Sequence, residues 1–324
     1  MDKISYLESL FTPPENTAAG YTFCDIPIPI TFEESKICMV GIPTDITTTF
    51  GKTTSFGPEA IRIASAKQIE TLVFEDNIEI YEKALIYDIG DVNFVKPRED
   101  KITDIKEISK FWIDFDNKLS SVLSILKELN KIPVILGGEH TITYSIYKEL
   151  SKNNPLLIHF DAHRDMKSVY QGMSMCHTTP FYHLIREGYL RGNDLIQIGI
   201  RQGDREENKF AFDNGVTTFD AWDCNSSLET VSRWLKSHSY NRDIYISFDI
   251  DVYDISYLPC TGTPEPFGLN PFQILELVNS ISDSARLVGL DFVETGLKNN
   301  DYREGALATQ TLLRILSRPY ISNL

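Results

Sequence analysis

The chain has 324 residues, of which 42% are hydrophobic and 24% are charged, and its formal net charge at pH 7 is −15. This composition is that of a globular protein with a sizeable core, and the negative charge disfavours nucleic acid as a partner because phosphate binding needs a basic face. No apolar run approaches the length of about 18 residues that a membrane span needs, and the N-terminus lacks the pattern of a signal peptide. Five cysteines without a CxxC pair argue against a disulfide framework. We therefore expect a soluble, cytoplasmic protein that binds no membrane.

Short apolar runs rich in β-branched residues alternate along the chain with longer amphipathic segments, which predicts a mostly parallel sheet covered by helices on both faces. No linker or internal repeat divides the chain, so we expect an irregular N-terminal extension over residues 1–35 and a single catalytic domain over 36–324. The runs predict strands at residues 37–43, 84–90, 132–138, 156–160, 195–201, 244–250 and 287–293. The amphipathic segments predict helices at residues 57–65, 104–130, 141–150, 227–236, 271–281 and 305–316.

Ionisable residues follow four of these strands. In open α/β sheets, sites form beyond the carboxyl ends of the strands, so these side chains are expected to converge. Each one has an ordinary alternative as a helix cap, a turn former or a packed ring, and Glu139 could simply favour the dipole of the helix after it. Carboxylates gathered at one edge nevertheless need a positive partner, and oxygen and imidazole donors suit Mn²⁺-like ions, two of which would favour hydrolysis. The residues are His140, Asp161, His163, Asp165, Asp249, Asp251, Asp254, Asp291 and Glu294.

Six short motifs in this order resemble the ureohydrolase family, which includes arginase, agmatinase and guanidino-acid hydrolases. They are "SFGPEAIR" from Ser55, "GGEHT" from Gly137, "FDAHRD" from Phe160, "SFDIDVYD" from Ser247, "TGTPEPFGL" from Thr261 and "DFVE" from Asp291. The resemblance spans roughly residues 36 to 316. It implies a three-layer α/β/α fold, a binuclear Mn²⁺ site and a homo-oligomer, either a trimer or a hexamer.

The resemblance also implies roles for individual residues. One ion would be held by His140, Asp161, Asp165 and Asp249, and the other by His163, Asp161, Asp249 and Asp251. Asp165 would also aim the nucleophilic water, Glu294 would receive the planar, cationic guanidinium group, and His177 in "MSMCHTTPF" would move a proton at the leaving amine. Of the other histidines, His159 is interpreted as structural, and His183 and His238 fall on predicted helical faces without a site signal.

The loop between Asp165 and His177 departs from the family pattern where the substrate tail would be recognised. Lys167 stands near the position that helps arginases hold the substrate carboxylate, and it could bind such a carboxylate or be an exposed loop lysine. Thr178 and Phe267 replace family glycines and add bulk. Asp204 and Glu206 could meet the amine of agmatine, although solvated loop charges are the simpler interpretation.

The expected reaction is metal-dependent hydrolysis of a guanidino group, with agmatine, which would give putrescine and urea, as the first candidate substrate. A guanidino-acid hydrolase is second, and arginase or formimidoylglutamase follow. Two other possibilities stay open: an inactive ureohydrolase-like subunit and a single-zinc deacylase. Ni²⁺, Co²⁺ and Fe²⁺ accept similar ligands to Mn²⁺, so the sequence leaves the native metal open.

Overall fold

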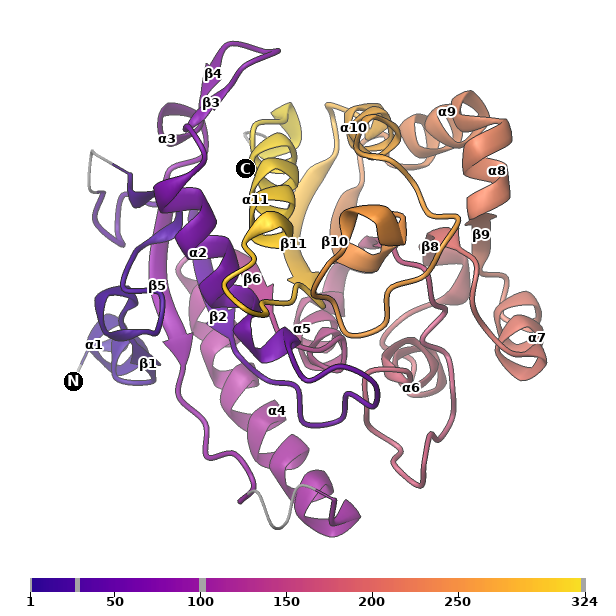
Figure 1. Cartoon of the computed structure of the whole chain (residues 1–324), viewed down its shortest axis with the longest axis horizontal. Coiled ribbons are helices and arrows are strands. Elements are labelled where there is room, and N and C mark those ends of the chain that lie inside the picture. The colour runs from indigo at the N-terminus through magenta and orange to yellow at the C-terminus, as the bar shows by residue number, and fades with distance from the viewer. Residues whose placement is uncertain (1, 27–29, 99–102, 322–324) are drawn as a thin grey trace.

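The computed structural model describes residues 2–26, 30–98 and 103–321. Its centre is a nine-stranded sheet in the order β1-β5-β2-β6-β11-β10-β7-β8-β9 (Figure 1). All neighbouring strands pair in parallel except β1, which is antiparallel to β5. The strands are β1 Phe11–Thr12, β2 Ile37–Ile42, β5 Ile86–Val92, β6 Ile132–Gly137, β7 Leu156–Phe160, β8 Leu195–Ile200, β9 Thr217–Asp220, β10 Asp243–Asp249 and β11 Arg286–Val293.

Helices cover both faces of this sheet, which confirms the predicted three-layer α/β/α fold (Figure 1). The helices are α1 Lys3–Glu8, α2 Gly57–Lys67, α3 Ile80–Lys83, α4 Ile105–Glu128, α5 Ile142–Leu150, α6 Pro180–Arg186, α7 Arg205–Asp213, α8 Ala221–Ser226, α9 Leu228–His238, α10 Pro271–Ser280 and α11 Arg303–Leu316. Helices α2, α8, α9, α10 and α11 pack into one hydrophobic core. Helices α1, α4, α5, α6 and α7 pack into the other.

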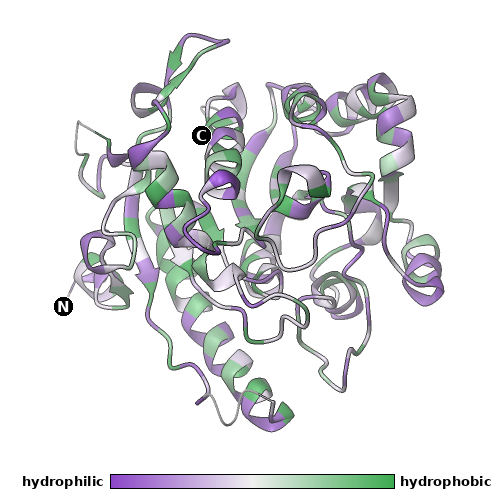
Figure 2. Ribbon diagram, viewed as in Figure 1, coloured by the Kyte–Doolittle hydropathy of each residue, from purple (hydrophilic) through white to green (hydrophobic). Residues whose placement is uncertain are grey.

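The two cores follow from the two-residue repeat of the strands. On β6, Ile132, Val134 and Leu136 point into the first core, whereas Ile135 points into the second. Every residue of β6 is buried, because helices lie on both of its faces. Hydrophobic residues colour much of the helices and strands, with hydrophilic residues between them (Figure 2).

All seven predicted strands and all six predicted helices are present, with their ends shifted by at most two residues. The largest shift among the strands is that of β5, which begins at Ile86 rather than at residue 84. Strand β9 and helices α6, α7 and α8 were not predicted, because each is short and carries few buried residues.

The N-terminal segment is more regular than we expected. It contains α1 and β1, and Phe11 of β1 pairs with Val92 of β5, so this part of the prediction was wrong. Residues 1 and 27–29 of the predicted extension, and residues 99–102 and 322–324 of the predicted domain, lie outside the described residues. A two-stranded hairpin, β3 Leu72–Val73 and β4 Ile78–Glu79, projects from the body of the molecule (Figure 1). The division into two regions stays a prediction.

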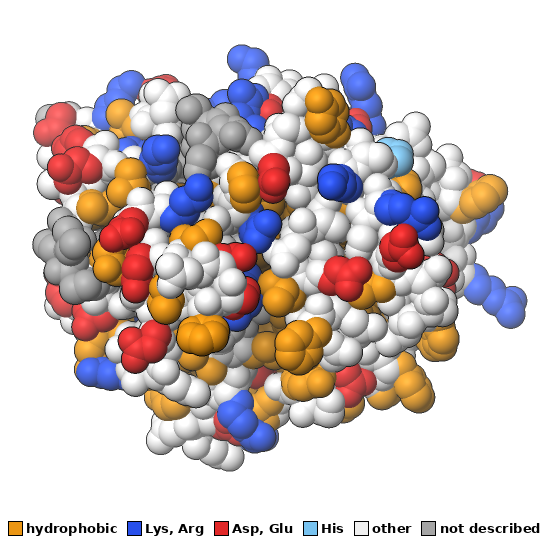
Figure 3. Space-filling view, turned by 90° about the horizontal axis from the view of Figure 1, so that it is seen from above, with side chains coloured by type: hydrophobic (Ala, Val, Ile, Leu, Met, Phe, Trp, Pro, Cys, Tyr) orange, Lys and Arg blue, Asp and Glu red, His pale blue; other side chains and the backbone are white. Residues whose placement is uncertain are grey.

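Among the described helices, none is both long and apolar enough to cross a membrane. On the face drawn in Figure 3, lysine and arginine side chains are scattered among acidic and uncharged groups and form no continuous basic patch.

Candidate metal centre and substrate site

Four parallel strands at the centre of the sheet carry the candidate site at their carboxyl ends. Strands β6, β7, β10 and β11 are direct neighbours in the order β6-β11-β10-β7. The two glycines after β6 allow close packing there: a Cβ atom on Gly137 would lie 2.7 Å from a methyl group of Val293, and one on Gly138 would lie 2.5 Å from the carbonyl oxygen of Ile42. His140 lies two residues after Gly138, so this tight packing restricts the position of its backbone.

The ring of His140 lies among three carboxylates from the other strands. Its Nδ1 atom is 3.1 Å from Asp161 Oδ2, 3.0 Å from Asp165 Oδ2 and 3.2 Å from Asp249 Oδ2. All four residues are buried. The structure thus brings together the four residues that were predicted to hold the first ion.

The residues predicted for the second ion lie beside the first group. His163 Nδ1 is 2.9 Å from Asp251 Oδ2 and 3.5 Å from Asp161 Oδ1. Asp249 joins the two groups, because its Oδ1 atom accepts a hydrogen bond of 2.8 Å from the backbone N–H of Asp251. With 27% of its side chain exposed, His163 forms the solvent side of this cluster.

The hydrogen bonds of His140 test whether the cluster suits a metal ion. Ser247 Oγ donates to Asp291 Oδ1 at 2.7 Å, so this hydroxyl can only accept at the 3.0 Å contact with His140 Nε2. The ring proton therefore sits on Nε2, and Nδ1 presents a lone pair to the carboxylates. Two buried atoms of the cluster, His140 Nδ1 and Asp251 Oδ2, form no hydrogen bond with another described residue. A lone pair and carboxylate oxygens that face each other without a proton between them fit a cation.

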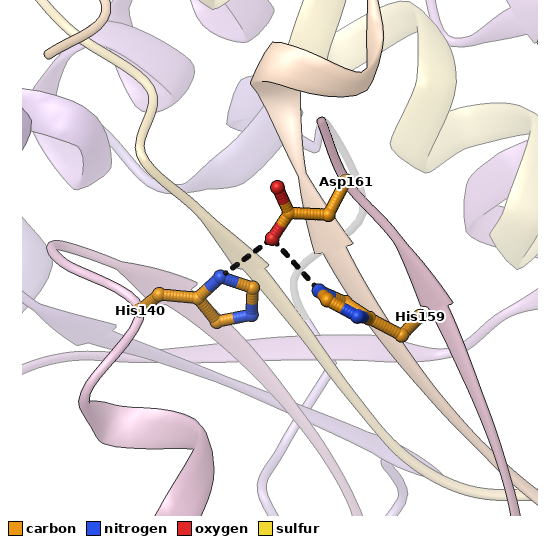
Figure 4. A group of neighbouring side chains, drawn as sticks. All are labelled: His140, His159 and Asp161. Atoms are coloured by element: carbon orange, nitrogen blue, oxygen red, sulfur yellow. Dashed lines mark hydrogen bonds and ion pairs between the residues drawn. The ribbon is translucent and has the colours of Figure 1, made fainter. Parts of the chain in front are cut away.

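His159 also touches the cluster but is poorly suited to bind an ion (Figure 4). Its Nδ1 accepts a hydrogen bond of 3.1 Å from the amide nitrogen of Gln197. The orientation of this amide is fixed by Arg164, because the amide oxygen accepts from the Arg164 guanidinium and the amide nitrogen donates to the Arg164 backbone carbonyl. The proton of His159 therefore lies on Nε2, which donates to Asp161 Oδ2 at 2.8 Å. With both nitrogens engaged, His159 holds the carboxylate in place, as its structural interpretation implied.

Burial makes this concentration of carboxylates costly without a cation. It raises the pKa of Asp165 to about 7, with the charge of Asp161 adding to the shift. Burial, followed by the charges of Asp251 and Asp161, raises the pKa of Asp249 well above its usual value. A bound divalent cation would oppose both effects, because it stabilises the ionised carboxylates.

Glu294 lies directly beside the cluster. Its Oε1 atom accepts a 2.8 Å hydrogen bond from the backbone N–H of His140, and its own N–H donates to Gly138 O at 2.9 Å. Its backbone is left-handed, with φ of 60°, which turns the chain away at the end of β11. Thr261 in the "TGTPEP" segment donates to the backbone carbonyl oxygen of Glu294 at 2.7 Å, so this loop fixes the backbone of Glu294 while the N–H of His140 holds its carboxylate.

His177 reaches the same region from the loop before α6. The ring is partly buried, and burial above all lowers its pKa to about 4. The hydroxyl of Thr47 lies 3.3 Å from its Nδ1 atom and accepts a 3.0 Å hydrogen bond from its backbone N–H. A neutral imidazole at this position has one nitrogen free to accept a proton.

Lys167 is a half-buried, ion-paired residue rather than an exposed loop lysine, whereas its role as a substrate ligand stays a prediction. Its ammonium group is 2.5 Å from Asp204 Oδ2 and 3.0 Å from Glu207 Oε2, and only 25% of its side chain is exposed. Asp204 caps α7 in a reciprocal capping box with Glu207, so it is a helix cap rather than a free loop charge. Glu206 is exposed on the same helix.

The two other departures from the family pattern lie on loops. The backbone carbonyl oxygen of Thr178 accepts a 3.0 Å hydrogen bond from the backbone N–H of Lys167. The hydroxyl of Thr178 lies 3.3 Å from Cys176 Sγ. Phe267 is 71% exposed and has φ of 64°, a conformation for which glycine would be less strained.

The two remaining histidines lie on helices as expected, His183 on α6 and His238 at the end of α9. Asp254 is an N-cap that accepts from the backbone N–H of Ser256.

Two residues that contact the cluster were not predicted as part of it. Ser247 orients His140 together with Asp291, which was predicted to converge here without an assigned role, and Glu265 Oε1 lies 3.7 Å from His163 Nε2. Strand parity is a signal for Ser247, because it lies two residues before Asp249 and shares its face of β10. Register pairs Ser247 with Asp291 on the neighbouring strand, but no sequence pattern alone gives that register.

A mostly parallel α/β/α sheet with two histidines and four aspartates gathered beyond its central strands defines a metal-dependent hydrolase. The model of the Arginase family matches residues 35–316, and this chain belongs to that family as a ureohydrolase. The agmatinase of Pyrococcus horikoshii is 31% identical over 85% of this chain and 89% of that protein. The mitochondrial guanidino acid hydrolase of Homo sapiens is 29% identical over 87% of this chain and 78% of that protein. The crystal structure of agmatine ureohydrolase of Thermoplasma volcanium gives a TM-score of 0.78, with 27% identity and 98% of both chains covered.

Proposed function

We propose that this ureohydrolase acts on agmatine and releases putrescine and urea. The observation that carries a guanidino substrate is the position of Glu294, a fixed carboxylate bonded to the backbone of His140 beside the cluster. Guanidinium is planar and permanently charged, so a carboxylate is its natural partner. Agmatine is chosen because several relatives that match most of the chain are agmatinases.

The residues of the cluster are proposed to hold two Mn²⁺ ions. Their chemistry supports this: oxygen and imidazole donors without thiolates suit Mn²⁺, although Ni²⁺, Co²⁺ or Fe²⁺ accept the same set. When bound, a pair of such ions supplies Lewis acidity and lowers the pKa of water toward neutrality. The proposed set is His140, Asp161, Asp165 and Asp249 for one ion and His163, Asp161, Asp249 and Asp251 for the other.

The other residues then have distinct tasks. Glu294 binds the guanidinium and fixes its plane, because its Oε1 atom is already held by the backbone N–H of His140. Asp165 accepts a hydrogen bond from the attacking water and so directs its lone pair toward the guanidino carbon. His177, neutral at pH 7, takes up the proton that the attacking water releases and passes it to the leaving amine.

A guanidino acid is the second candidate, and Lys52 is the observation that favours it. Its ammonium group donates to the carbonyl oxygens of Asp45 at 2.8 Å and Ile46 at 3.3 Å, which leaves one N–H for another acceptor. The preceding Gly51 packs against Gly262, where a Cβ atom would lie 3.6 Å from Glu294 Oε2. A cation at this rim suits a substrate with a carboxylate tail better than the amine of agmatine.

A urea-release assay on the Mn²⁺-loaded protein tests both candidates. Agmatine, 4-guanidinobutyrate, 3-guanidinopropionate and arginine are compared at equal concentrations. The proposal requires agmatine to have the highest kcat/KM, and the matched variant Glu294→Gln to lose nearly all of it. A preference for 4-guanidinobutyrate that falls about tenfold in Lys52→Gln would establish the second candidate instead.

Metal analysis of the same sample separates the remaining classes. Two ions per chain agree with the ureohydrolase site, whereas one ion per chain without urea release would indicate a deacylase. Absence of both metal and urea release would indicate an inactive subunit. Elemental analysis and the urea-release assay, both on purified protein, together distinguish these outcomes.

We also propose that the protein is a cytoplasmic homo-oligomer, a trimer or hexamer. The five cysteines are all buried and unpaired, which suits a reducing compartment. Phe272 is 83% exposed on α10 at the edge of an apolar groove that also includes Leu275 and Leu307. Burial of such a groove between copies is favourable. Light scattering of the purified protein measures the assembly directly.

A further inference from the structure

Thr47 connects His177 to a buried carboxylate outside the candidate metal cluster. It lies in the loop after β2, and only 2% of its surface is exposed. On one side its hydroxyl oxygen contacts the ring and the backbone of His177, at 3.3 Å and 3.0 Å. On the other side the same oxygen lies 2.9 Å from Glu139 Oε1. One hydroxyl therefore links two ionisable groups that are far apart in the sequence.

The Glu139 carboxylate is surrounded by donors. It is fully buried and receives the Thr47 N–H at 2.6 Å, the Thr47 hydroxyl at 2.9 Å and the Thr141 hydroxyl at 2.9 Å. In its ionised form the Glu139 carboxylate accepts hydrogen bonds and does not donate them. The single hydroxyl hydrogen of Thr47 is therefore directed at Glu139.

This direction determines how Thr47 meets His177. With its hydrogen given to Glu139, the Thr47 oxygen has only lone pairs left, and these accept the backbone N–H and the Nδ1–H of His177. The ring proton is thereby placed on Nδ1, and Nε2 is left with a free lone pair. Within the part of the chain that the structure describes, no other residue forms a hydrogen bond with this ring.

We propose that Thr47 is a positioning residue that fixes the orientation and tautomer of His177, so that Nε2 is the atom that exchanges a proton with the leaving amine. The proposal rests on the proposed ureohydrolase reaction and on the role of His177 in it. It gives Glu139 a task in that arrangement, which is to hold the Thr47 hydroxyl in one rotamer. Thr47 itself touches no reacting atom.

The test is a double-mutant cycle with Thr47→Val and His177→Ala, measured as kcat and KM for urea release by Mn²⁺-loaded protein. Valine keeps the shape of threonine but removes the hydroxyl. We expect Thr47→Val to lower kcat by about tenfold or more with little change in KM, because a misplaced proton donor loses much of its contribution. Thr47→Ser, which keeps the hydroxyl, should stay close to wild type.

The decisive comparison is made in the His177→Ala background. If Thr47 acts through His177, Thr47→Val causes no further loss of kcat there, since coupled residues are not additive. A purely structural role would lower kcat by the same factor in both backgrounds and would overturn the proposal, as would wild-type kcat in either single variant. Thr49→Val, an exposed neighbour in the same loop, is the matched control and should have wild-type kcat.

Two measurements keep the outcomes distinct. Metal content and thermal unfolding show whether Thr47→Val is folded and loaded, and Thr47→Ala replaces it in the cycle if it is not. Failure of the wild-type protein to release urea from any guanidino compound would remove the proposed function itself. Urea release by wild type together with additive losses would remove only the inference about Thr47.

Discussion

The Nε2–H of His140 donates to the hydroxyl of Ser247 at 3.0 Å, and this contact leaves Nδ1 of the same ring to face three carboxylates. The direction is fixed one step further away, because Ser247 donates in turn to Asp291. Partners of this kind set the tautomer of a metal-binding histidine and its orientation. The two residues outside the cluster are therefore as important for its geometry as the ring itself.

Ser247→Ala is predicted to lower the affinity for Mn²⁺ by about tenfold or more, because His140 loses the acceptor that selects its tautomer. Titration of the metal-free protein with Mn²⁺, followed by calorimetry, measures the change. Ser256→Ala, an exposed serine after β10, is the control and should bind as wild type does. Equal affinities in all three proteins would contradict the assigned tautomer.

Asp249→Asn is predicted to remove most of the urea release and one of two metal equivalents. Asp249 contacts the ring of His140 and the backbone N–H of Asp251, so its carboxylate is the expected bridge. Elemental analysis and the urea assay give the two numbers from one preparation. Asp213→Asn changes an exposed aspartate whose side chain pairs with Lys209, and it should change neither. A variant at position 249 with two ions and full turnover would disprove the ligand assignment.

Lys167→Met is predicted to leave substrate preference unchanged and to lower stability by about 1 kcal/mol. The ammonium group is held by Asp204 and by the buried Glu207, and its removal leaves that glutamate without its cation. The ratio of kcat/KM for agmatine to that for 4-guanidinobutyrate and the midpoint of urea unfolding measure the two effects. A changed kcat/KM ratio with an unchanged unfolding midpoint would contradict this prediction and assign substrate recognition to Lys167.

Glu304 predicts a pH dependence of stability. Its carboxylate accepts the backbone N–H groups of Thr261 at 2.7 Å and Gly296 at 2.8 Å, which joins the two loops beside Glu294. Burial raises its pKa from 4.5 to about 7. A raised pKa means that the folded state binds this proton more tightly than the unfolded state. Its contribution to stability is therefore complete below about pH 4.5 and falls by up to about 3 kcal/mol as the pH rises through 7.

The variant Glu304→Gln cannot ionise at this position. Relative to Glu304→Gln, the wild type should therefore lose unfolding free energy as the pH rises from 4.5 to 7.5. This holds whatever the difference between the two proteins is at pH 4.5. Urea unfolding at several pH values measures this difference. Glu229→Gln, on an exposed glutamate of α9, should show no such shift. A difference that is constant with pH would show that the hydrogen bonds keep Glu304 ionised.

The central strands were predictable because burial on both faces gives an unbroken apolar run, as in residues 132–137. Strand β9 was not, because all of its residues are only half-buried and three of the four are polar. Helix α7 was missed for a similar reason: only Glu207 and Ala211 of its nine residues are buried. Segments that bury little have little periodicity to detect.

The convergence of the candidate ligands was predictable from the rule that parallel strands end at one edge. Their partners were not, because Ser247 and Gln197 meet the histidines across strands whose register the sequence does not state. The ion pairs of Lys167 could not be predicted for the same reason. Its two partners lie 37 and 40 residues away, on a helix whose position depends on the whole fold.

The hydrogen bonds behind His159 extend much further than the cluster itself. Thr218 of β9, the outermost strand, contacts Arg164, which contacts Gln197, which contacts His159 and so Asp161. A half-buried threonine on the edge strand of the sheet is thus connected to the fully buried carboxylate of Asp161 through neutral and cationic groups in fixed orientations. Substitutions at that edge of the sheet are therefore expected to affect the candidate metal cluster despite the distance. Laboratory evolution of this protein can thus alter the cluster through residues near the surface.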